Sequence, residues 1–390
     1  MIGPRTRLLP VLGWPVLIAA LTLTALGLLG AYAGEAGPDV RPVKATKQLV
    51  HLGIGLTGLL VVQIVGYREL GRWAYPLFGL ILVLLVLLVV ARKINLAPII
   101  PERRNTFRWI VLGPINIQVS EYAKIVYILA LAQYLRFRTN YRTIRGLLMP
   151  FALTLLPMGL ILKEPDLGTS ILLLPTLFVM LFVAGAKIKH LVLILLLGLL
   201  AAPAFYYSPL MNPYQKERIK ALFRQDESDV GWRQNAGYHL YRSKVALGSG
   251  GFSGQGFTQG AFFRHDLLPE EHNDFIFAVI GHQWGFVGCM VVLLCYLVII
   301  ASGLTIASIT TDPLGRLLAV GVCAILCAQA LINTGMTIGL MPITGMSLPF
   351  VSMGGSGLIA CYLGVGILIS VARPRPIDIA RKPFEYDRSE

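Results

Sequence analysis

Charged residues are scarce in this sequence: Asp, Glu, Lys and Arg make up 14% of its 390 residues, whereas 55% are hydrophobic. A water-soluble domain has no use for that much apolar surface, so the composition excludes one. The mean hydropathy of +0.69 instead indicates a polytopic membrane protein. The net charge of +14 then reflects basic loops beside anionic headgroups and an anionic substrate, rather than a nucleic-acid-binding surface.

Cysteine and histidine are also rare, with 5 and 6 residues. All the cysteines lie within apolar runs, which is typical of small buried side chains and not of a disulfide framework. The acids and histidines before residue 274 lack the spacings of a permanent metal site. We therefore expect no resident metal, and a divalent cation such as Mg²⁺ or Mn²⁺ would arrive with a phosphate-bearing substrate.

Long apolar runs predict ten transmembrane helices in a single polytopic domain that covers residues 1–390. The runs lie at roughly 8–33, 46–66, 74–91, 119–135, 147–162, 168–186, 190–207, 274–303, 315–340 and 356–372. Lys and Arg are enriched in the loops that this topology leaves inside the cell, which places both termini in the cytoplasm. The expected fold class is therefore an all-α integral membrane protein.

Two predicted extracellular loops are long. The first, about 92–118, holds Arg108 and Trp109 in a stretch whose apolar and aromatic residues suit the membrane interface. The second, about 208–273, joins the seventh and eighth helices and has no clear secondary structure, which is typical of a functional or disordered loop. Its glycine-rich run, Gly248 to Gly260, lacks the ending of a nucleotide-binding loop, so we expect a tight path packed against lipid or sugar.

Asp274 lies where an acidic stretch turns into an apolar helix, at the membrane surface. A carboxylate that has lost part of its solvation becomes a better base for the proton of an alcohol. Asn273 or Asp274 has an alternative role as a cap for the helix that follows. The two roles do not exclude each other.

Other charges fall inside or beside the predicted helices. Glu121 and Lys124 are spaced to form an ion pair on one helix face, and pairing lowers the free-energy cost of burying both charges. The pair is either functional or purely structural. Asp166 either caps the next helix or faces the same cavity as Asp274. The candidates for binding a diphosphate are Arg108, Lys124, Arg218 and Lys244.

An outward carboxylate, a basic loop and a large membrane body together suggest a lipid-linked, anionic and already activated substrate. A polyprenyl diphosphate sugar fits each of these features. Its lipid would lie between helices, its diphosphate would meet Arg and Lys, and its sugar would reach Asp274.

Several stretches resemble the SEDS family (shape, elongation, division and sporulation), and they follow the family's order from the third helix to the last. They are Arg108–Lys124, Glu164–Thr169, Ala236–Gly256, Leu268–Val279 and Asn333–Ser356. The resemblance implies a ten-helix fold in the bacterial cytoplasmic membrane, polymerisation of lipid II at its outer face, and a class B penicillin-binding protein as partner. It also implies that Asp274 is the essential carboxylate. The run Thr337–Gly345 is more similar to the elongation branch than to the division branch.

The sequence departs from the family pattern at a few positions, including Val119 before Ser-Glu and Met353 before Gly-Gly. His282 and Gln283 stand where an acidic pair is usual. This change leaves fewer carboxylates near Asp274 and weakens any mechanism that needs a second acid.

The expected reaction is inverting glycosyl transfer with Asp274 as general base. A diphosphate leaving group needs charge neutralisation but no protonating acid, so one carboxylate suffices, unlike the two of a glycoside hydrolase. A flippase for lipid-linked precursors is the alternative function, and it would need alternating access but no base. A scaffold for the partner synthase is a third hypothesis, under which Asp274 would be dispensable.

Overall fold

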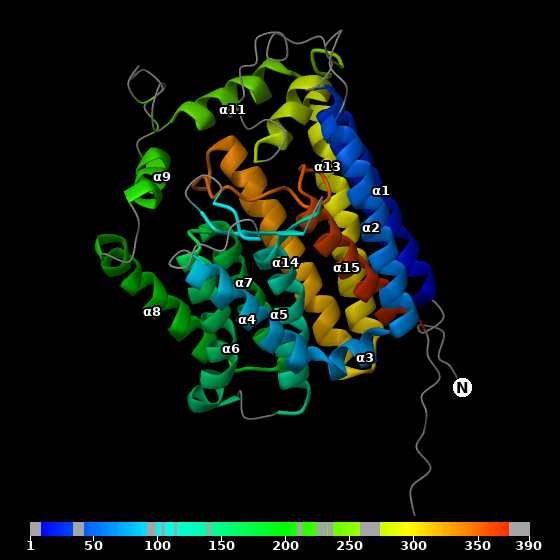
Figure 1. Ribbon diagram of the computed structural model, residues 1–390, viewed down its shortest axis with the longest axis vertical. Helices are drawn as coiled ribbons and strands as arrows, with labels where there is room; N and C mark the ends of the chain where they lie inside the picture. Colours follow the sequence, from blue (N-terminus) through cyan, green and yellow to red (C-terminus); the bar gives the residue numbers. More distant parts are fainter. Residues whose placement is uncertain are drawn as a thin grey trace, which may run out of the picture.

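The protein is a bundle of helices (Figure 1). The computed structural model describes residues 9–33, 43–91, 99–102, 106–112, 115–138, 142–208, 213–223, 225, 232, 237–257 and 274–373. Its long helices are α1 (Leu9–Ala33), α2 (Val43–Val65), α4 (Ala74–Ala91), α5 (Val119–Arg136), α6 (Ile144–Lys163), α7 (Leu167–Ala184), α8 (Ile188–Tyr207), α13 (Ile276–Ile309), α14 (Pro313–Ile338) and α15 (Gly355–Ala372). The shorter elements are α3 (Tyr67–Arg72), β1 (Trp109–Leu112), β2 (Ile115–Gln118), α9 (Pro213–Phe223) and α11 (Tyr238–Ser249).

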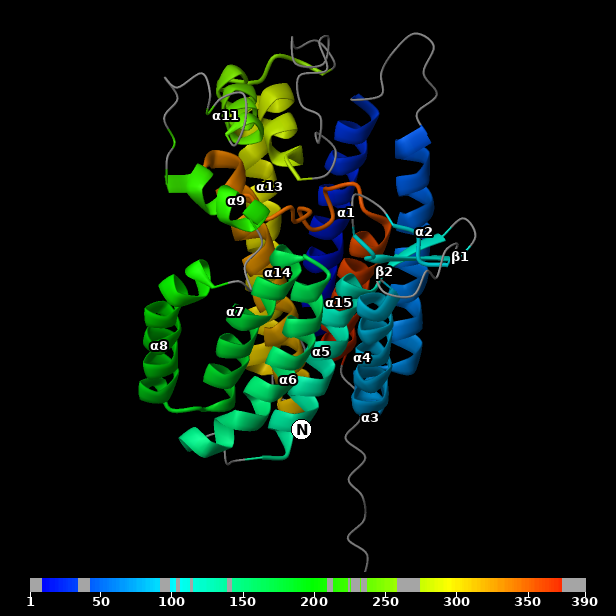
Figure 2. The ribbon, with the colours of Figure 1, turned by 60° about the vertical axis from the view of Figure 1, so that its left-hand side comes forward.

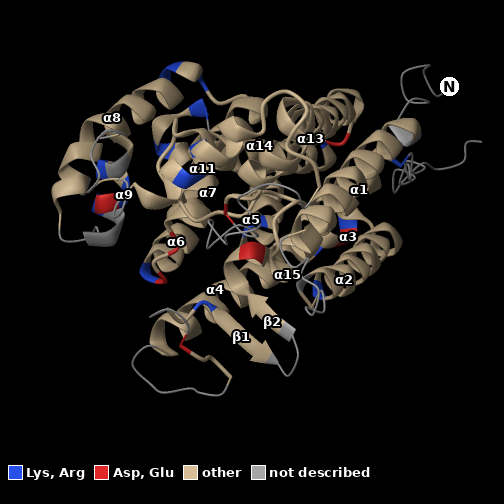
Figure 3. Cartoon of the chain, turned by 90° about the horizontal axis from the view of Figure 1, so that it is seen from above, with Lys and Arg blue, Asp and Glu red and all other residues tan. Residues whose placement is uncertain are grey.

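Each predicted apolar run coincides with one long helix, and within the described residues 8 helices are long and apolar enough to cross a membrane. This confirms a multi-pass membrane protein. The remaining two long helices fall short of this criterion for different reasons. α8 offers the shorter apolar stretch Ile188–Ala204, and α5 carries Glu121, Lys124 and Arg136 along its length. Seen from above, most of the ribbon bears neither sign of charge (Figure 3).

α14 lies at the centre of the bundle, where it packs against α5, α7, α13 and α15. α1 and α2 cover α13 and α15 on one side (Figure 1), and α8 stands apart on the opposite side, next to α7 (Figure 2). The leucines of α8 are mostly exposed, as expected of a helix that lipid surrounds. The core is therefore built on the helices that flank α14.

The fold is helical, as expected, with a local exception in the first long loop: β1 and β2 form an antiparallel hairpin in which Trp109 is paired with Gln118. One expectation about the second long loop was wrong. The loop 208–273 is not without secondary structure, since α9 and α11 lie within its described part. Strands of 4 residues are too short for a period of two to be recognised, and both helices are polar enough to resemble a loop.

The glycine-rich run packs against α13 over its described part, residues 248–257, and its packing against lipid or sugar stays a prediction. α13 is interrupted at Gly285, whose φ of 63° and ψ of −156° are not helical. There, Phe286 N–H donates to the Gly251 carbonyl at 2.9 Å. A Cβ at Gly254 would lie 2.1 Å from the Gln283 carbonyl oxygen, so this contact requires glycine. The run thus satisfies backbone groups that the broken helix leaves open.

Residues 339–354, here called the α14–α15 segment, join these two helices through irregular backbone. The segment crosses the bundle near the level of the hairpin, below α11 (Figures 1 and 2). The start of α7 packs closely on it, because a Cβ at Gly168 would lie 2.2 Å from Met346 Cγ. The start of α15 lies near it too, since a Cβ at Gly357 would be 3.6 Å from Ser347 Oγ. Helices far apart in the sequence therefore meet at this segment.

Candidate functional site

Asp274 is a half-buried turn residue immediately before α13. The N-cap of α13 is Phe275, and no side chain makes a capping hydrogen bond there. Asp274 lies one residue earlier, so it does not occupy the capping position that was its alternative role. Asn273, the other capping candidate, lies outside the described residues. The backbone carbonyl of Asp274 accepts a hydrogen bond from Asn333 Nδ2 at 2.9 Å. Its carboxylate oxygen Oδ2 lies 3.5 Å from the point that a Cβ on Gly345 would occupy.

Arg218 of α9 reaches the same point from another direction. Its Nη1 atom lies 3.4 Å from the Cβ position of Gly345, which is exposed and has a φ of 73°. A side chain at this position would be strained and would contact both the guanidinium and the carboxylate. The structure thus brings together two of the predicted site residues, a carboxylate and a guanidinium, around a glycine of the α14–α15 segment.

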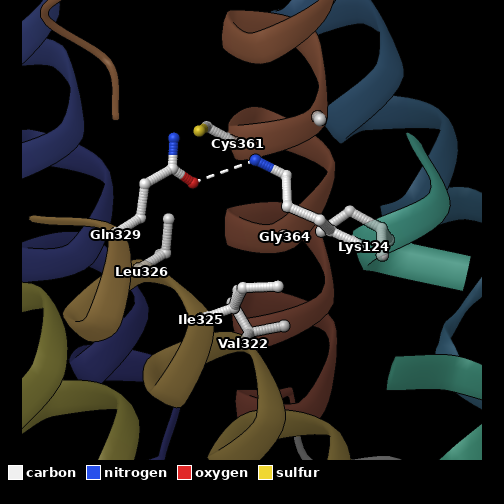
Figure 4. Close-up of a pocket in the computed structure, with 9 residues that line it drawn as sticks. Lys124, Val322, Ile325, Leu326, Gln329, Cys361 and Gly364 are labelled. Atoms are coloured by element: carbon white, nitrogen blue, oxygen red, sulfur yellow. Dashed lines mark hydrogen bonds between the residues drawn. The ribbon is translucent and has the colours of Figure 1, made fainter. Parts of the chain in front are cut away.

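Glu121 and Lys124 form the predicted ion pair, with Lys124 Nζ and Glu121 Oε2 2.8 Å apart. The side chains are 8% and 4% exposed, so the pair is buried. Lys124 Nζ also donates to Gln329 Oε1 at 2.9 Å, as Figure 4 shows. A small cavity of about 10 Å³, room for about one water molecule, is lined by Lys124, Gln329 and mainly apolar side chains.

Two amide side chains that sequence analysis overlooked lie one turn apart on α14. Gln329 Nε2 donates to the Ser347 carbonyl at 2.8 Å, and Asn333 Nδ2 donates to the Met346 carbonyl at 2.6 Å. Both residues are buried. Polar residues at i and i+4 within an apolar helix share one face, and this spacing is the signal that could have identified them.

Arg108 and Asp166 are engaged at the turn between α6 and α7. Arg108 donates from Nε to the Glu164 carbonyl at 2.7 Å and from Nη2 to the Pro165 carbonyl at 2.5 Å. Asp166 caps α7, as one of its two expected roles required: Oδ1 accepts from Thr169 N–H at 3.2 Å. Its Oδ2 accepts from Ser120 Oγ at 3.1 Å, which ties the cap to the start of α5.

Glu164, in the same turn, is a buried carboxyl that sequence analysis treated only as part of a motif. Its side chain is inaccessible, and neither carboxyl oxygen has a hydrogen-bond partner. Burial, together with the nearby Asp166 carboxylate and against the opposing charge of Arg108, raises the pKa of Glu164 to about 9. Glu164 is therefore uncharged at neutral pH.

The last two predicted residues border the site from other elements. Lys244 of α11 donates from Nζ to Gln225 Oε1 at 2.6 Å, and Gln225 Nε2 donates to the Gly339 carbonyl at 2.7 Å. Lys244 thus lies at the end of α14. Trp109 is half-buried at the start of β1, opposite Gln118.

His282 and Gln283, which replace the family's usual acidic pair, are buried just before the break in α13. The His282 Nδ1 atom lies 2.7 Å from Ser249 Oγ of α11. Within the described part of the chain, no group of three or more His, Cys, Asp or Glu residues is arranged to hold a metal ion. The acids and histidines at 265–272 lie outside that part.

Comparison with known proteins gives consistent matches along almost the whole chain. The FtsW/RodA/SpoVE family, described as "Cell cycle protein", matches residues 14–376. The chain is 32% identical over 366 residues to the probable peptidoglycan glycosyltransferase FtsW of Trichlorobacter lovleyi, covering 92% of each. It is 32% identical over 356 residues to the peptidoglycan glycosyltransferase MrdB of Escherichia coli K12, covering 91% of each.

A solved structure agrees with these relatives. A chain from a study of how a peptidoglycan synthase complex coordinates polymerization and crosslinking is 32% identical to this chain, with a TM-score of 0.76. The match covers 92% of this chain and 97% of that one. Since profile, sequence and structure agree over most of its length, the chain belongs to the FtsW/RodA/SpoVE family, that is, to the SEDS proteins.

Proposed function

We propose that the protein is a peptidoglycan glycosyltransferase that polymerises lipid II at the outer face of the cytoplasmic membrane. The observation that carries this proposal is the position of the Asp274 carboxylate beside the Arg218 guanidinium at Gly345. Relatives named as peptidoglycan glycosyltransferases support this function over a precursor flippase. The role in cell elongation rests on the run Thr337–Gly345, because relatives named FtsW and MrdB are equally similar to this chain.

Asp274 is the general base of this reaction. It removes the proton from the acceptor hydroxyl, and the resulting oxygen attacks the anomeric carbon of the donor sugar from the face opposite the leaving group. The bond from the anomeric carbon to the diphosphate breaks, and polyprenyl diphosphate leaves with inversion at that carbon. A general base in hydrogen-bonding reach of the hydroxyl contributes on the order of 10²–10⁴ in rate.

Arg218 neutralises the charge of the departing diphosphate. Its guanidinium borders the same space as the base, and the planar fork of an arginine matches phosphate oxygens. A divalent cation, Mg²⁺ or Mn²⁺, enters bound to the diphosphate and belongs to the substrate rather than to a protein cage.

The other predicted substrate-binding residues surround this centre at the level of the α14–α15 segment. In the described conformation their polar groups contact other parts of the protein, so binding of substrate would exchange some of these bonds. These residues are Arg108, Trp109, Asp166 and Lys244; Glu121 and Lys124, also predicted to bind substrate, instead pair with each other inside the bundle.

All ten long helices cross the membrane, with both termini in the cytoplasm. α5 is able to cross because its two intramembrane charges neutralise each other. This topology puts α11, the hairpin and Asp274 on the outer side. The expected partner is a class B penicillin-binding protein of the elongation type, and the similarity to a chain of a peptidoglycan synthase complex supports this assembly.

The test is polymerisation of purified lipid II by purified Asp274→Asn protein, with product length measured on gels. We expect normal expression, membrane insertion and melting temperature, and a polymerisation rate lower by a factor on the order of 10²–10⁴, because an amide is not a base. Glu69→Gln is the matched control, since Glu69 lies in α3 at the other end of the bundle and pairs with Arg72. Polymerisation by the Asn variant within about threefold of wild type would remove Asp274 from the mechanism.

A further inference from the structure

Two sets of hydrogen bonds, linked by the backbone between Met346 and Ser347, join the buried ion pair to the backbone of Asp274. Lys124 Nζ donates to Gln329 Oε1 at 2.9 Å, and Gln329 Nε2 donates to the Ser347 carbonyl at 2.8 Å. One peptide earlier in the α14–α15 segment, the Met346 carbonyl accepts from Asn333 Nδ2 at 2.6 Å. The same Asn333 Nδ2 donates to the Asp274 carbonyl at 2.9 Å.

The two amides act as a clamp because of where they stand on α14. Residues four apart share a helix face, so Gln329 and Asn333 face two consecutive carbonyls of the same segment. Both side chains are buried, which shields these bonds from bulk solvent. The clamp therefore fixes the position of Met346 and Ser347 along α14.

Each amide also makes a second contact: Gln329 accepts a hydrogen bond from the Lys124 ammonium, and Asn333 donates one to the Asp274 carbonyl. Gln329 has one orientation that serves both neighbours: its carbonyl faces the Lys124 ammonium (Figure 4), and its NH₂ group donates to the Ser347 carbonyl. If the ammonium is removed, that preference is lost and the amide is free to turn away from Ser347. A change at the ion pair thus alters how the segment is held.

The segment held by the clamp forms one wall of the proposed active site. Gly345, the residue before Met346, is the point at which the Asp274 carboxylate and the Arg218 guanidinium meet. Asn333 holds the opposite wall as well, through the Asp274 carbonyl. A displacement of about 1 Å between a base and its hydroxyl can cost about 10²-fold in rate, so this geometry has consequences for turnover.

We propose that Gln329 and Asn333 are positioning residues that couple the Glu121–Lys124 ion pair to the placement of Asp274. Lys124 then supports catalysis through Gln329 and the α14–α15 segment, without touching the diphosphate. This inference rests on the proposed function, because it takes Asp274 as the base. Loss of the ion pair should therefore lower the turnover number and leave the binding of lipid II unchanged.

The test is a double-mutant cycle between Lys124→Met and Gln329→Met, with kcat and KM for lipid II polymerisation measured in the same detergent. Each single change should lower kcat by a factor on the order of 10 to 10² and leave KM within about twofold. The double variant should be no slower than the slower single variant, because both changes break one series of bonds. Gln63→Met is the matched control, since Gln63 is a buried amide that donates to the Gly366 carbonyl at 2.6 Å, remote from the series.

Losses in kcat that multiply in the double variant would overturn the coupling, and so would a rise in KM with unchanged kcat, the result expected if Lys124 binds diphosphate directly. An equal loss of kcat in Gln63→Met would reduce the effect to general destabilisation and would also overturn it. If Lys124→Met does not fold, the cycle between Gln329→Met and Asn333→Leu decides by the same criterion. Asp274→Asn separates a failure of the proposed function from a failure of the coupling. An active Asp274→Asn protein would refute the proposed function. An inactive one, together with kcat losses that multiply in the double variant, would refute the coupling alone.

Discussion

The buried ion pair of α5 permits a quantitative prediction about stability. Glu121 and Lys124 are separated by 2.8 Å, and both side chains are shielded from solvent. Replacing one partner by a neutral residue of similar size leaves the other charge without its counter-ion in a low-dielectric environment. Replacing both removes the attraction and the desolvation cost together. We therefore expect the double variant Glu121→Gln with Lys124→Met to be more stable than either single variant.

The magnitudes follow from the geometry. At an effective dielectric constant of about 20, two unit charges 2.8 Å apart attract each other by about 6 kcal/mol. Desolvation cancels part of this energy, and loss of one partner from a buried pair costs about 3–5 kcal/mol. In the double variant the remaining defect is Gln329 Oε1, which loses its donor at a cost of about 1–3 kcal/mol. The double variant should thus recover about 2 kcal/mol relative to the single variants.

Equilibrium unfolding in detergent micelles, with the folded fraction followed by gel filtration, measures these differences. The matched control is the exposed pair of Glu69 and Arg72, which has the same i,i+3 spacing and an N–O distance of 2.7 Å. Its single and double neutral variants should each change stability by less than about 1 kcal/mol, because water screens the charges. A double variant of the buried pair that is no more stable than the weaker single variant would refute this account of the pair.

Two further predictions concern the walls of the site. Gly345→Ala would place a methyl group 3.4 Å from Arg218 Nη1 and 3.5 Å from Asp274 Oδ2 at a φ of 73°, so the polymerisation rate should fall by a factor on the order of 10². The control Gly79→Ala, whose new methyl group would have no atom within 4 Å, should keep its activity. A Gly345→Ala protein with normal activity would show that Gly345 is not part of the site. The pKa of Glu164 rises from 4.5 to about 9 on folding, so the folded state keeps a proton that the unfolded state releases, and stability should fall as pH rises from about 4.5 to 9. Thermal unfolding across this range should show a smaller fall for Glu164→Gln, and identical pH profiles would contradict the assignment.

The helices could be predicted from the sequence because each depends on its own composition. A run of apolar residues long enough to cross a bilayer forms a helix irrespective of its neighbours, since lipid leaves the backbone no other partner. The break in α13 could not be predicted in this way. It depends on Gly285 meeting the run at Gly251, and that contact joins residues distant in the sequence.

The candidate site divides along the same line. The pairing of Glu121 with Lys124 and the capping by Asp166 are local interactions, so spacing was enough to predict the pair and to offer the cap as one of two roles for Asp166. The amides of Gln329 and Asn333 have no local partner to reveal them, because their acceptors lie on the α14–α15 segment. Their function is defined by a contact that only the folded chain contains.

The irregular backbone of the α14–α15 segment explains why structural and catalytic polar groups are hard to separate in this protein. Carbonyls inside a membrane bundle have to find donors, and this irregular segment supplies only some of them itself, as where the Val351 and Ser352 N–H groups donate to the Leu348 carbonyl. Four side chains from three helices donate to this one: Gln48 of α2, Tyr296 of α13, and Gln329 and Asn333 of α14. Bonds that satisfy the backbone also immobilise Gly345 beside Asp274, and an immobile wall is what a general base needs to meet its hydroxyl at the right distance. Substitutions among these donors should therefore affect turnover even where no donor touches the substrate.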